Sequence, residues 1–229
     1  MEKYPQIALE RFDKANIWIK YIIAQIHPCI KGNILEVGAG CGSFTESYIN
    51  NKYKITLTDH DSRNIEELGK KFKNFSNVNI VSRDVEKFSE KFDTIIYFNV
   101  LEHIEKDNKE IEDSLDKLNE GGHLIILVPA HQKLYGNLDK AVGHFRRYDI
   151  SYFKKGFKNS ILLKVKYLDV MGYFLYFLNK IFFKKEVYPT KFKIFIWDKI
   201  FTPITIIADF ITRYKFGKNV LCILKKVDN

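Results

Sequence analysis

The sequence contains little cysteine, and its three cysteines form no recognisable pattern. Cys29, Cys41 and Cys222 are scattered through 229 residues, with no CxxC pair and no Cys/His spacing typical of a metal site. Such a small, odd set does not build a disulfide framework, so we expect free thiols in a reducing compartment. The polar first residues, 1–11, do not resemble a signal peptide. We therefore expect a cytoplasmic protein.

The chain also lacks an apolar run long enough to cross a bilayer. Asn179, Lys180 and Asp198 are among the polar residues that interrupt the aromatic runs of the last third. No run reaches the roughly 20 residues that a spanning helix requires. Internal repeats are absent too, and hydrophobic residues make up 46% of the chain, as in ordinary globular proteins. Length and composition therefore favour a single α/β domain over residues 1–229.

Apolar runs and helical patterns alternate through the first half of the chain. Strands are expected over 34–37, 53–58, 78–81, 92–98 and 123–128, and helices over 10–27, 44–51, 62–72 and 107–118. Ser62 is the expected N-cap of the third helix. Strands that alternate with helices predict a parallel sheet covered by helices on both faces.

The order of the expected elements divides the chain into five consecutive segments of one domain. They are an N-terminal helix (1–30), a cofactor-binding core (31–129), a substrate loop with a sixth strand (130–169), an aromatic and basic insertion (170–216) and a last strand (217–229). Because the insertion lies between the last two strands, it is expected to extend the same domain.

A glycine-rich turn follows the first expected strand. Glu36 and Val37 end the strand, and Gly38, Gly40 and Gly42 follow in the pattern GxGxG before the next helix. Glycines at such a turn let the backbone approach a ligand at a helix N-terminus. The spacing differs from the GxGxxG of dinucleotide-binding proteins, whose pyrophosphate Glu36 would repel. Glu36 better suits a cofactor with a cationic amino-acid end, although it could also serve only the helix N-terminus.

Acidic residues also follow the next two strands. Asp59 ends the second strand, where it can accept hydrogen bonds from the hydroxyls of a ribose. Asp61 could compete for the ribose, but Asp59 is favoured because it directly ends the strand. Asp84 follows the third strand and can accept a hydrogen bond from an adenine amino group. Acids at three successive strand ends indicate a ligand with a ribose, an adenine and an ammonium group.

Several of these segments resemble the motifs of one family. LEVGAGCGSFT (35–45) is similar to the first motif of the class I S-adenosylmethionine-dependent methyltransferases. FDTIIYFNVLEHI (92–104) resembles the fourth-strand motif of that family, and LNEGGHLIILVP (118–129) resembles its glycine turn and fifth strand. The resemblance covers roughly residues 33–129.

The resemblance implies a cofactor, a fold and binding residues. The cofactor is S-adenosylmethionine, with S-adenosylhomocysteine as its product, and the adenine-binding loop includes Asp84 and Val85. The fold is a Rossmann-like three-layer sandwich, whose seven-stranded, mostly parallel sheet has an antiparallel last strand. Asn99, after the fourth strand, is expected to face the cofactor.

Histidines beyond the fourth and fifth strands are candidate catalytic groups. Open α/β sheets bind ligands outside the carboxyl ends of their strands, and methylation of a hydroxyl or ammonium group is helped by a base. The candidates are His144, His103 and His131, with His144 favoured. The pair Glu102-His103 could equally serve only packing or a helix start.

A metal ion is not expected from the sequence. Some members of the family bind a divalent metal through a Glu-x-x-Glu-His string and a further histidine. Asn99 stands here where the first of these glutamates would be, which removes a hard anionic ligand.

The loop over residues 131–149 is expected to hold the substrate. Guanidinium groups suit bidentate capture of phosphate or carboxylate, and two arginines are adjacent here between aromatic residues. The expected substrate-binding residues are Arg146, Arg147, Tyr135 and Tyr148. One arginine could instead pair with Asp139 or Asp149.

Basic charge is concentrated in the last third of the chain. Residues 151–229 contain 16 Lys and Arg but 5 Asp and Glu, whereas residues 1–150 contain 21 and 23. This imbalance predicts an anionic partner, although a solvated basic surface is an alternative. The insertion 170–216 could form a lid, a peripheral membrane contact or an oligomer contact. Nucleic acid is not expected, because the basic residues alternate with large aliphatic ones and no RNA-binding motif accompanies them.

These observations predict a methyltransferase that acts on an oxygen or nitrogen of a small molecule or glycan. An anionic or lipid-linked cell-envelope precursor is the expected substrate, and the protein could associate peripherally with the inner face of the membrane. An RNA or protein methyltransferase, and a cofactor-binding module without catalysis, remain alternatives. The oligomeric state is left open.

Overall fold

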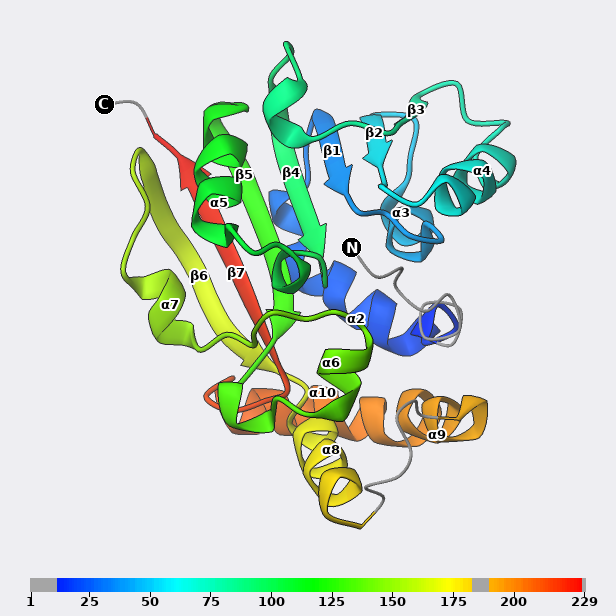
Figure 1. Ribbon diagram of the computed structural model, residues 1–229, viewed down its shortest axis with the longest axis vertical. Coiled ribbons are helices and arrows are strands. Elements are labelled where there is room, and N and C mark those ends of the chain that lie inside the picture. Colours follow the sequence, from blue (N-terminus) through cyan, green and yellow to red (C-terminus); the bar gives the residue numbers. More distant parts are fainter. Residues whose placement is uncertain (1–11, 183–189, 228–229) are drawn as a thin grey trace.

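The computed structural model describes residues 12–182 and 190–227, which contain one seven-stranded sheet. The strands are β1 (Asn33–Val37), β2 (Lys54–Thr58), β3 (Val78–Val81), β4 (Phe92–Phe98), β5 (Leu118–Pro129), β6 (Ser160–Leu168) and β7 (Asn219–Lys226). Their order is β3-β2-β1-β4-β5-β7-β6, and β7 runs antiparallel to both of its neighbours (Figure 1). The predicted fold class is confirmed.

Helices cover both faces of the sheet because the strands bury side chains on both sides. On β1, Ile34 packs in one apolar cluster and Leu35 in another, and on β5 Ile125 and Leu124 alternate in the same way. The first face is covered by α2 (Asn16–Ile26) and α4 (Ser62–Lys71), and the second by α5 (Asp107–Asp116) and α7 (Ile150–Lys154). The result is the predicted three-layer sandwich.

Most predicted element bounds agree with the structure to within a few residues. Residues 10 and 11 of the predicted N-terminal helix lie outside the described residues. The fifth strand begins earlier than predicted, at Leu118, because this residue already pairs with Phe92 of β4. The predicted N-cap of α4 is wrong, since the side chain of Asp61 rather than Ser62 accepts the capping hydrogen bond.

The insertion between β6 and β7 is helical where it is described. It contains α8 (Val170–Phe182), α9 (Lys191–Ile196), the π-helix η5 (Trp197–Phe201) and α10 (Thr202–Ile211), while residues 183–189 lie outside the described residues. These helices and α6 (Asn137–Ala141) lie at the end of the molecule to which the arrows of β1, β4 and β5 point (Figure 1). The insertion therefore lies at the edge of the sheet where ligands bind.

Two buried aspartates attach the insertion to α2. Asp198 Oδ1 accepts hydrogen bonds from the backbone N–H groups of Ile17 (3.0 Å) and Trp18 (2.9 Å). These N–H groups lie in the first turn of α2, where helix geometry provides no acceptor. Asp209 accepts a hydrogen bond from the hydroxyl of Tyr21 (2.9 Å) and two more from the backbone at the start of α8 (2.9 and 3.0 Å). Both carboxylates thus join segments that are far apart in the sequence.

Replacing Asp209 by Ala is expected to lower the free energy of unfolding by about 2–4 kcal/mol, because one hydroxyl and two N–H groups lose their buried acceptor. Urea unfolding of the wild type and the variant measures the difference. Asp116→Ala is the matched control, since that side chain is 75% exposed. Equal losses in the two variants would contradict the anchoring role of Asp209.

Candidate functional site

The turn between β1 and α3 (Ser43–Tyr48) requires glycine at its first position. Gly38 has a φ of 67°, and a Cβ at this position would lie 2.6 Å from Cγ2 of Val100. Gly40 donates its N–H to Asp59 Oδ2 at 2.9 Å, and Gly42 is the N-cap of α3. The turn is therefore held against the carboxyl ends of β2 and β4.

Asp59 has room for further hydrogen bonds. Its other oxygen, Oδ1, accepts the N–H of Asp61 at 2.8 Å. A carboxylate offers about four acceptor positions, so two remain, enough for the hydroxyls of a ribose. Asp61 is engaged elsewhere, because it caps α4 and pairs with the guanidinium of Arg63 at 2.6 Å. This arrangement favours Asp59 over Asp61, and its contact with a ribose stays a prediction.

Glu36 lies beneath the turn and faces α3. Its carboxylate is buried, and Oε2 accepts hydrogen bonds from the hydroxyls of Thr45 (2.7 Å) and Tyr48 (2.6 Å). Burial raises the pKa of Glu36 to about 7, against the opposing effect of the two hydroxyls. Glu36 thus joins β1 to α3, and its predicted contact with the ammonium group of a cofactor stays a prediction.

Asp84 lies at the carboxyl end of β3 and is accessible. Its side chain is 39% exposed and pairs with Lys87 and, at 3.6 Å, with Nε2 of His60. The hydrogen bond from Lys87 lowers the pKa of Asp84, so the group is ionised at neutral pH. The side chain of Val85, in contrast to that of Asp84, is buried in the second apolar cluster. The predicted adenine contacts of both residues stay predictions.

The chain turns sharply after β4. Asn99 is exposed and has a φ of 54°, a left-handed conformation that is uncommon outside glycine. Its N–H donates to the carbonyl of Leu127 at 2.8 Å. The turn leads into the short helix η3 (Leu101–His103), so that Glu102 and His103 follow directly at this edge of the sheet.

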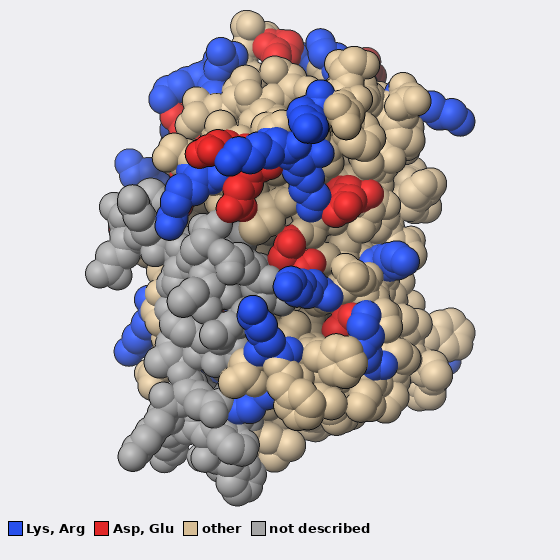
Figure 2. All heavy atoms as spheres, turned by 90° about the vertical axis from the view of Figure 1, so that its right-hand side faces the viewer, with Lys and Arg blue, Asp and Glu red and all other residues tan. Residues whose placement is uncertain are grey.

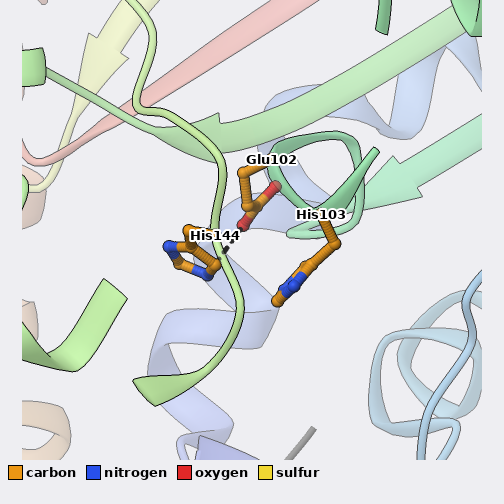
Figure 3. Close-up of side chains that lie close together, drawn as sticks. All are labelled: Glu102, His103 and His144. Atoms are coloured by element: carbon orange, nitrogen blue, oxygen red, sulfur yellow. Dashed lines mark ion pairs between the residues drawn. The ribbon is translucent and has the colours of Figure 1, made fainter. Parts of the chain in front are cut away.

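Glu102, His103 and His144 form a polar cluster, which we call the Glu-His-His cluster (Figure 3). The ring centroids of the two histidines are 4.6 Å apart, and Nε2 of His144 lies 3.7 Å from Oε1 of Glu102. Burial raises the pKa of Glu102 to about 7. Burial and the neighbouring His144 lower the pKa of His103 to about 3, so that this ring is neutral at physiological pH.

Asp139 orients His144. This buried carboxylate is 2.8 Å from Nδ1 of His144 and also accepts hydrogen bonds from Arg147 Nε (2.8 Å) and the hydroxyl of Tyr176 (3.1 Å). Burial acts to raise the pKa of Asp139, but the hydrogen bonds and charges of His144 and Arg147 outweigh it and hold the pKa well below its usual value. Because Asp139 is ionised, Nδ1 of His144 is the donor in this pair, and Nε2 is the ring nitrogen that faces Glu102.

From the sequence, Asp139 is expected only as a possible partner of an arginine, and its contact with His144 is not predicted. An acidic residue five positions before a histidine in the same loop was the available signal. Tyr176 had no such signal, because it reaches Asp139 from α8.

Arg147 and Tyr148 are buried and paired inside the protein, and their predicted substrate contacts stay predictions. The side chain of Arg147 is 4% exposed, and its guanidinium carbon lies 4.4 Å from the ring centroid of Tyr176. Tyr148 is 2% exposed and donates its hydroxyl hydrogen to Asp107 at 2.9 Å. Both residues hold the loop in place.

Arg146 and Tyr135 also make contacts within the protein. Arg146 pairs with Asp107 at 2.7 Å, although its side chain keeps 32% exposure. Tyr135 donates its hydroxyl hydrogen to the carbonyl of His144 at 2.6 Å. Their roles toward a substrate stay predictions.

His131 lies in a separate aromatic group. Its ring stacks on Tyr167 with centroids 4.7 Å apart and lies near Tyr173 (5.4 Å) and Phe216 (5.6 Å). Burial lowers its pKa, while Asp149, 3.3 Å away, opposes this effect. The structure brings His103 and His144 together but places His131 outside their cluster, and its catalytic role stays a prediction.

Within the described residues, no helix combines the length and the apolar character needed to span a membrane.

Comparison with known proteins gives one family and one relative that matches over part of its length. Residues 13–160 match a family described as a methyltransferase domain. An rRNA adenine N-6-methyltransferase of Lysinibacillus sphaericus is 38% identical over 74 residues, which are 31% of this chain and 30% of that protein. The match thus spans less than a third of the relative.

Two solved structures share the fold along most of the chain. Coclaurine N-methyltransferase, bound to N-methylheliamine and SAH, has a TM-score of 0.63 and 13% identity, over 92% of this chain and 72% of that one. The N-methyltransferase NodS from Bradyrhizobium japonicum WM9, in complex with S-adenosyl-L-homocysteine, has a TM-score of 0.57 and 16% identity, over 99% and 90%. At 13% and 16% identity, these two structures show that the fold is shared and nothing more.

Replacing Asp59 by Ala is expected to weaken the binding of S-adenosylhomocysteine by about 1.5–3 kcal/mol, through the loss of charge-assisted hydrogen bonds. Isothermal titration calorimetry measures the change. Asp61→Ala is the matched control, and its main effect should be the loss of a helix cap, which costs about 1 kcal/mol of stability. Unchanged affinity in the Asp59 variant would contradict the ribose assignment.

Glu36→Gln is expected to change how stability depends on pH. Since the pKa of Glu36 is about 7 in the folded protein against 4.5 when unperturbed, its stabilising protonated form is complete below pH 4.5 and is lost as the pH rises through 7. The variant has no such loss, so relative to the wild type it should gain up to about 3 kcal/mol between pH 4.5 and 8. Urea unfolding at several pH values tests this, with Glu66→Gln on the exposed face of α4 as the control. Parallel pH profiles for the wild type and Glu36→Gln would contradict the assignment.

Proposed function

The chain belongs to the class I S-adenosylmethionine-dependent methyltransferases, and on this premise we propose that it methylates an acceptor held at a membrane surface. The family and its cofactor are confirmed as predicted from the motifs. In the proposed reaction, a methyl group passes to an oxygen or nitrogen of a small molecule or glycan. An anionic or lipid-linked cell-envelope precursor is the acceptor class that fits the chain best.

The observation that carries this proposal is an exposed apolar surface on the insertion, which we call the insertion surface. Its exposed apolar side chains include Phe174, Phe177, Phe192, Phe195, Ile207, Phe210 and Ile211, between 46% and 74% exposed. Phe174 and Phe177 lie three residues apart and therefore on the same side of α8. Soluble monomeric proteins rarely expose so many large apolar side chains on neighbouring helices, and such surfaces mark interaction sites.

Basic side chains accompany the insertion surface. Lys191, Lys199, Arg213 and Lys215 are exposed on or directly after the same helices. Lys and Arg side chains lie beside uncharged surface at the lower end of the face in Figure 2. Aromatic residues next to basic ones suit the interface of an anionic bilayer, where the rings enter the headgroup region and the charges meet lipid phosphates. This combination favours a membrane surface over an oligomer contact.

The insertion also borders the Glu-His-His cluster. Tyr176 of α8 contacts Asp139 and Arg147, while Phe174 and Phe177 of the same helix are exposed. A helix is about 10 Å wide, so an acceptor bound at the outer side of α8 lies close to the cluster. The insertion would therefore act both as a wall of the site and as a membrane contact.

The Glu-His-His cluster would accept the proton of the acceptor. The cofactor supplies a methyl group on a sulfonium, and an O–H or protonated amine must lose a proton to become the nucleophile. Nε2 of His144 is the atom that would take this proton, because Asp139 engages Nδ1 and leaves Nε2 facing the cluster. Glu102, whose pKa burial raises to about 7, lies next to this nitrogen and can share the proton.

RNA methylation is the second candidate, favoured by the 74-residue match to an rRNA adenine N-6-methyltransferase. An RNA surface would require basic side chains along a phosphate backbone or aromatic rings that stack on bases. The insertion surface has rings and basic side chains, but it also exposes the aliphatic side chains of Ile204, Ile207 and Ile211, which cannot stack on bases and suit lipid better.

The double variant Ile207→Glu with Phe210→Glu is expected to reduce binding to anionic vesicles by at least about tenfold, because two charged groups would enter the interface. Sedimentation with phosphatidylglycerol-containing vesicles measures binding. Ile161→Glu, on the edge strand β6 and 53% exposed in the wild type, is the control.

The acceptor class is tested with S-adenosylmethionine that carries a labelled methyl group. The protein is incubated separately with a membrane lipid extract, a soluble small-molecule extract and total RNA, and label in the lipid fraction is expected. Label in RNA, or vesicle binding that the double variant leaves unchanged, would contradict the proposal.

A further inference from the structure

We propose that the Glu-His-His cluster binds a divalent transition metal ion of the zinc type. This proposal revises the expectation, drawn from Asn99, that the chain holds no metal. The binding of the ion does not require the acceptor proposed above, and only the use made of the ion rests on the proposed function.

The three donor groups have the spacing of a metal site. Their ligand atoms lie within 4.8 Å of one another, and Glu102 Oε1 is 3.7 Å from Nε2 of His144. Two ligands about 2.1 Å from a tetrahedral zinc ion are about 3.4 Å apart. Small rotations of the side chains are therefore enough to close the cluster around an ion.

Glu102 supplies an independent indication of a missing cation. The residue is 1% exposed, no side chain that the structure describes donates a hydrogen bond to either carboxylate oxygen, and its ion-pair partner, Nε2 of His144, stays 3.7 Å from Oε1. A buried polar group without a partner is costly, and an ionised one more so. Figure 3 shows this carboxylate directed toward His144. A bound cation would give both oxygens a partner.

Asp139 prepares His144 for metal binding. Metal-ligating histidines usually donate their second ring N–H to a carboxylate, which sets the ring orientation and makes the other nitrogen a better ligand. Nδ1 of His144 lies 2.8 Å from Asp139 Oδ1, so Nε2 is the free ligand atom. Arg147 binds the same oxygen of Asp139 at 2.8 Å and keeps that carboxylate in place.

The donor set also selects the kind of metal. Two imidazoles and one carboxylate suit zinc and related transition metals and leave positions open for water or substrate. Magnesium and calcium prefer oxygen ligands, and this cluster offers one carboxylate beside two imidazoles. The donor set therefore favours a zinc-type ion over hard cations.

An ion at this position would change the role of His144 from base to ligand. An acceptor hydroxyl bound at an open position of the metal would lose its proton more readily, because the cation stabilises the alkoxide. The proton would then pass to solvent.

Metal binding is tested on the full chain after treatment with EDTA. Titration with ZnCl₂, followed by calorimetry, and with CoCl₂, followed by visible absorption, should each show one ion per chain. Glu102→Gln and His144→Ala should each weaken zinc binding by about 100-fold or more, and Asp139→Asn by about tenfold. His27→Ala, at an exposed histidine of the short helix η1 (His27–Cys29), should bind zinc as the wild type does.

Binding of S-adenosylhomocysteine is measured for every variant and should be retained, which separates loss of the metal site from loss of the fold. The proposal is overturned if the EDTA-treated wild type takes up less than one ion at micromolar zinc. It is also overturned if Glu102→Gln and His144→Ala both bind zinc as tightly as His27→Ala. Because these measurements use no acceptor, they stand even if the proposed acceptor is wrong.

Discussion

The arrangement of the Glu-His-His cluster and of the loop beside it depends on the buried carboxylate of Asp139. It joins His144 and Arg147 of the loop to Tyr176 of α8 through hydrogen bonds of 2.8 to 3.1 Å. A buried carboxylate is tolerated only when such partners offset the loss of hydration. The position of His144, the course of the loop and the packing of α8 are therefore coupled through one side chain.

Buried carboxylates also determine how the insertion meets the sheet. Asp198 binds free N–H groups at the start of α2, and Asp209 binds Tyr21 and the start of α8. Apolar packing alone would allow the helices to slide, whereas a hydrogen-bonded carboxylate accepts one arrangement. These contacts occupy the inner side of the insertion, while other aromatic side chains such as Phe192 and Phe210 are exposed, which is the basis of the proposed membrane contact.

Much of the fold could be predicted, and residues of a cofactor site could be proposed, because their signals are local. A short apolar run followed by GxGxG predicts a strand and a turn, and Asp59 directly ends its strand. The loop could not be predicted in the same way. Arg147 and Tyr148 have the composition of a substrate site, but Tyr176 and Asp107, which bind them, lie far away in the sequence. The sequence alone does not show whether an arginine side chain is buried or exposed.

By itself, the sequence determined the strand and helix pattern through its periodicity, and the family and its cofactor through motifs that resemble those of the family, because both signals lie within short segments. The tertiary structure decided which polar groups are paired inside the protein and which remain available. It buried Arg147 against Asp139 and left the carboxylate of Glu102 beside His144 without a hydrogen bond from any side chain that the structure describes. These outcomes depend on contacts between distant segments, since hydrogen bonding and burial are properties of the packed chain.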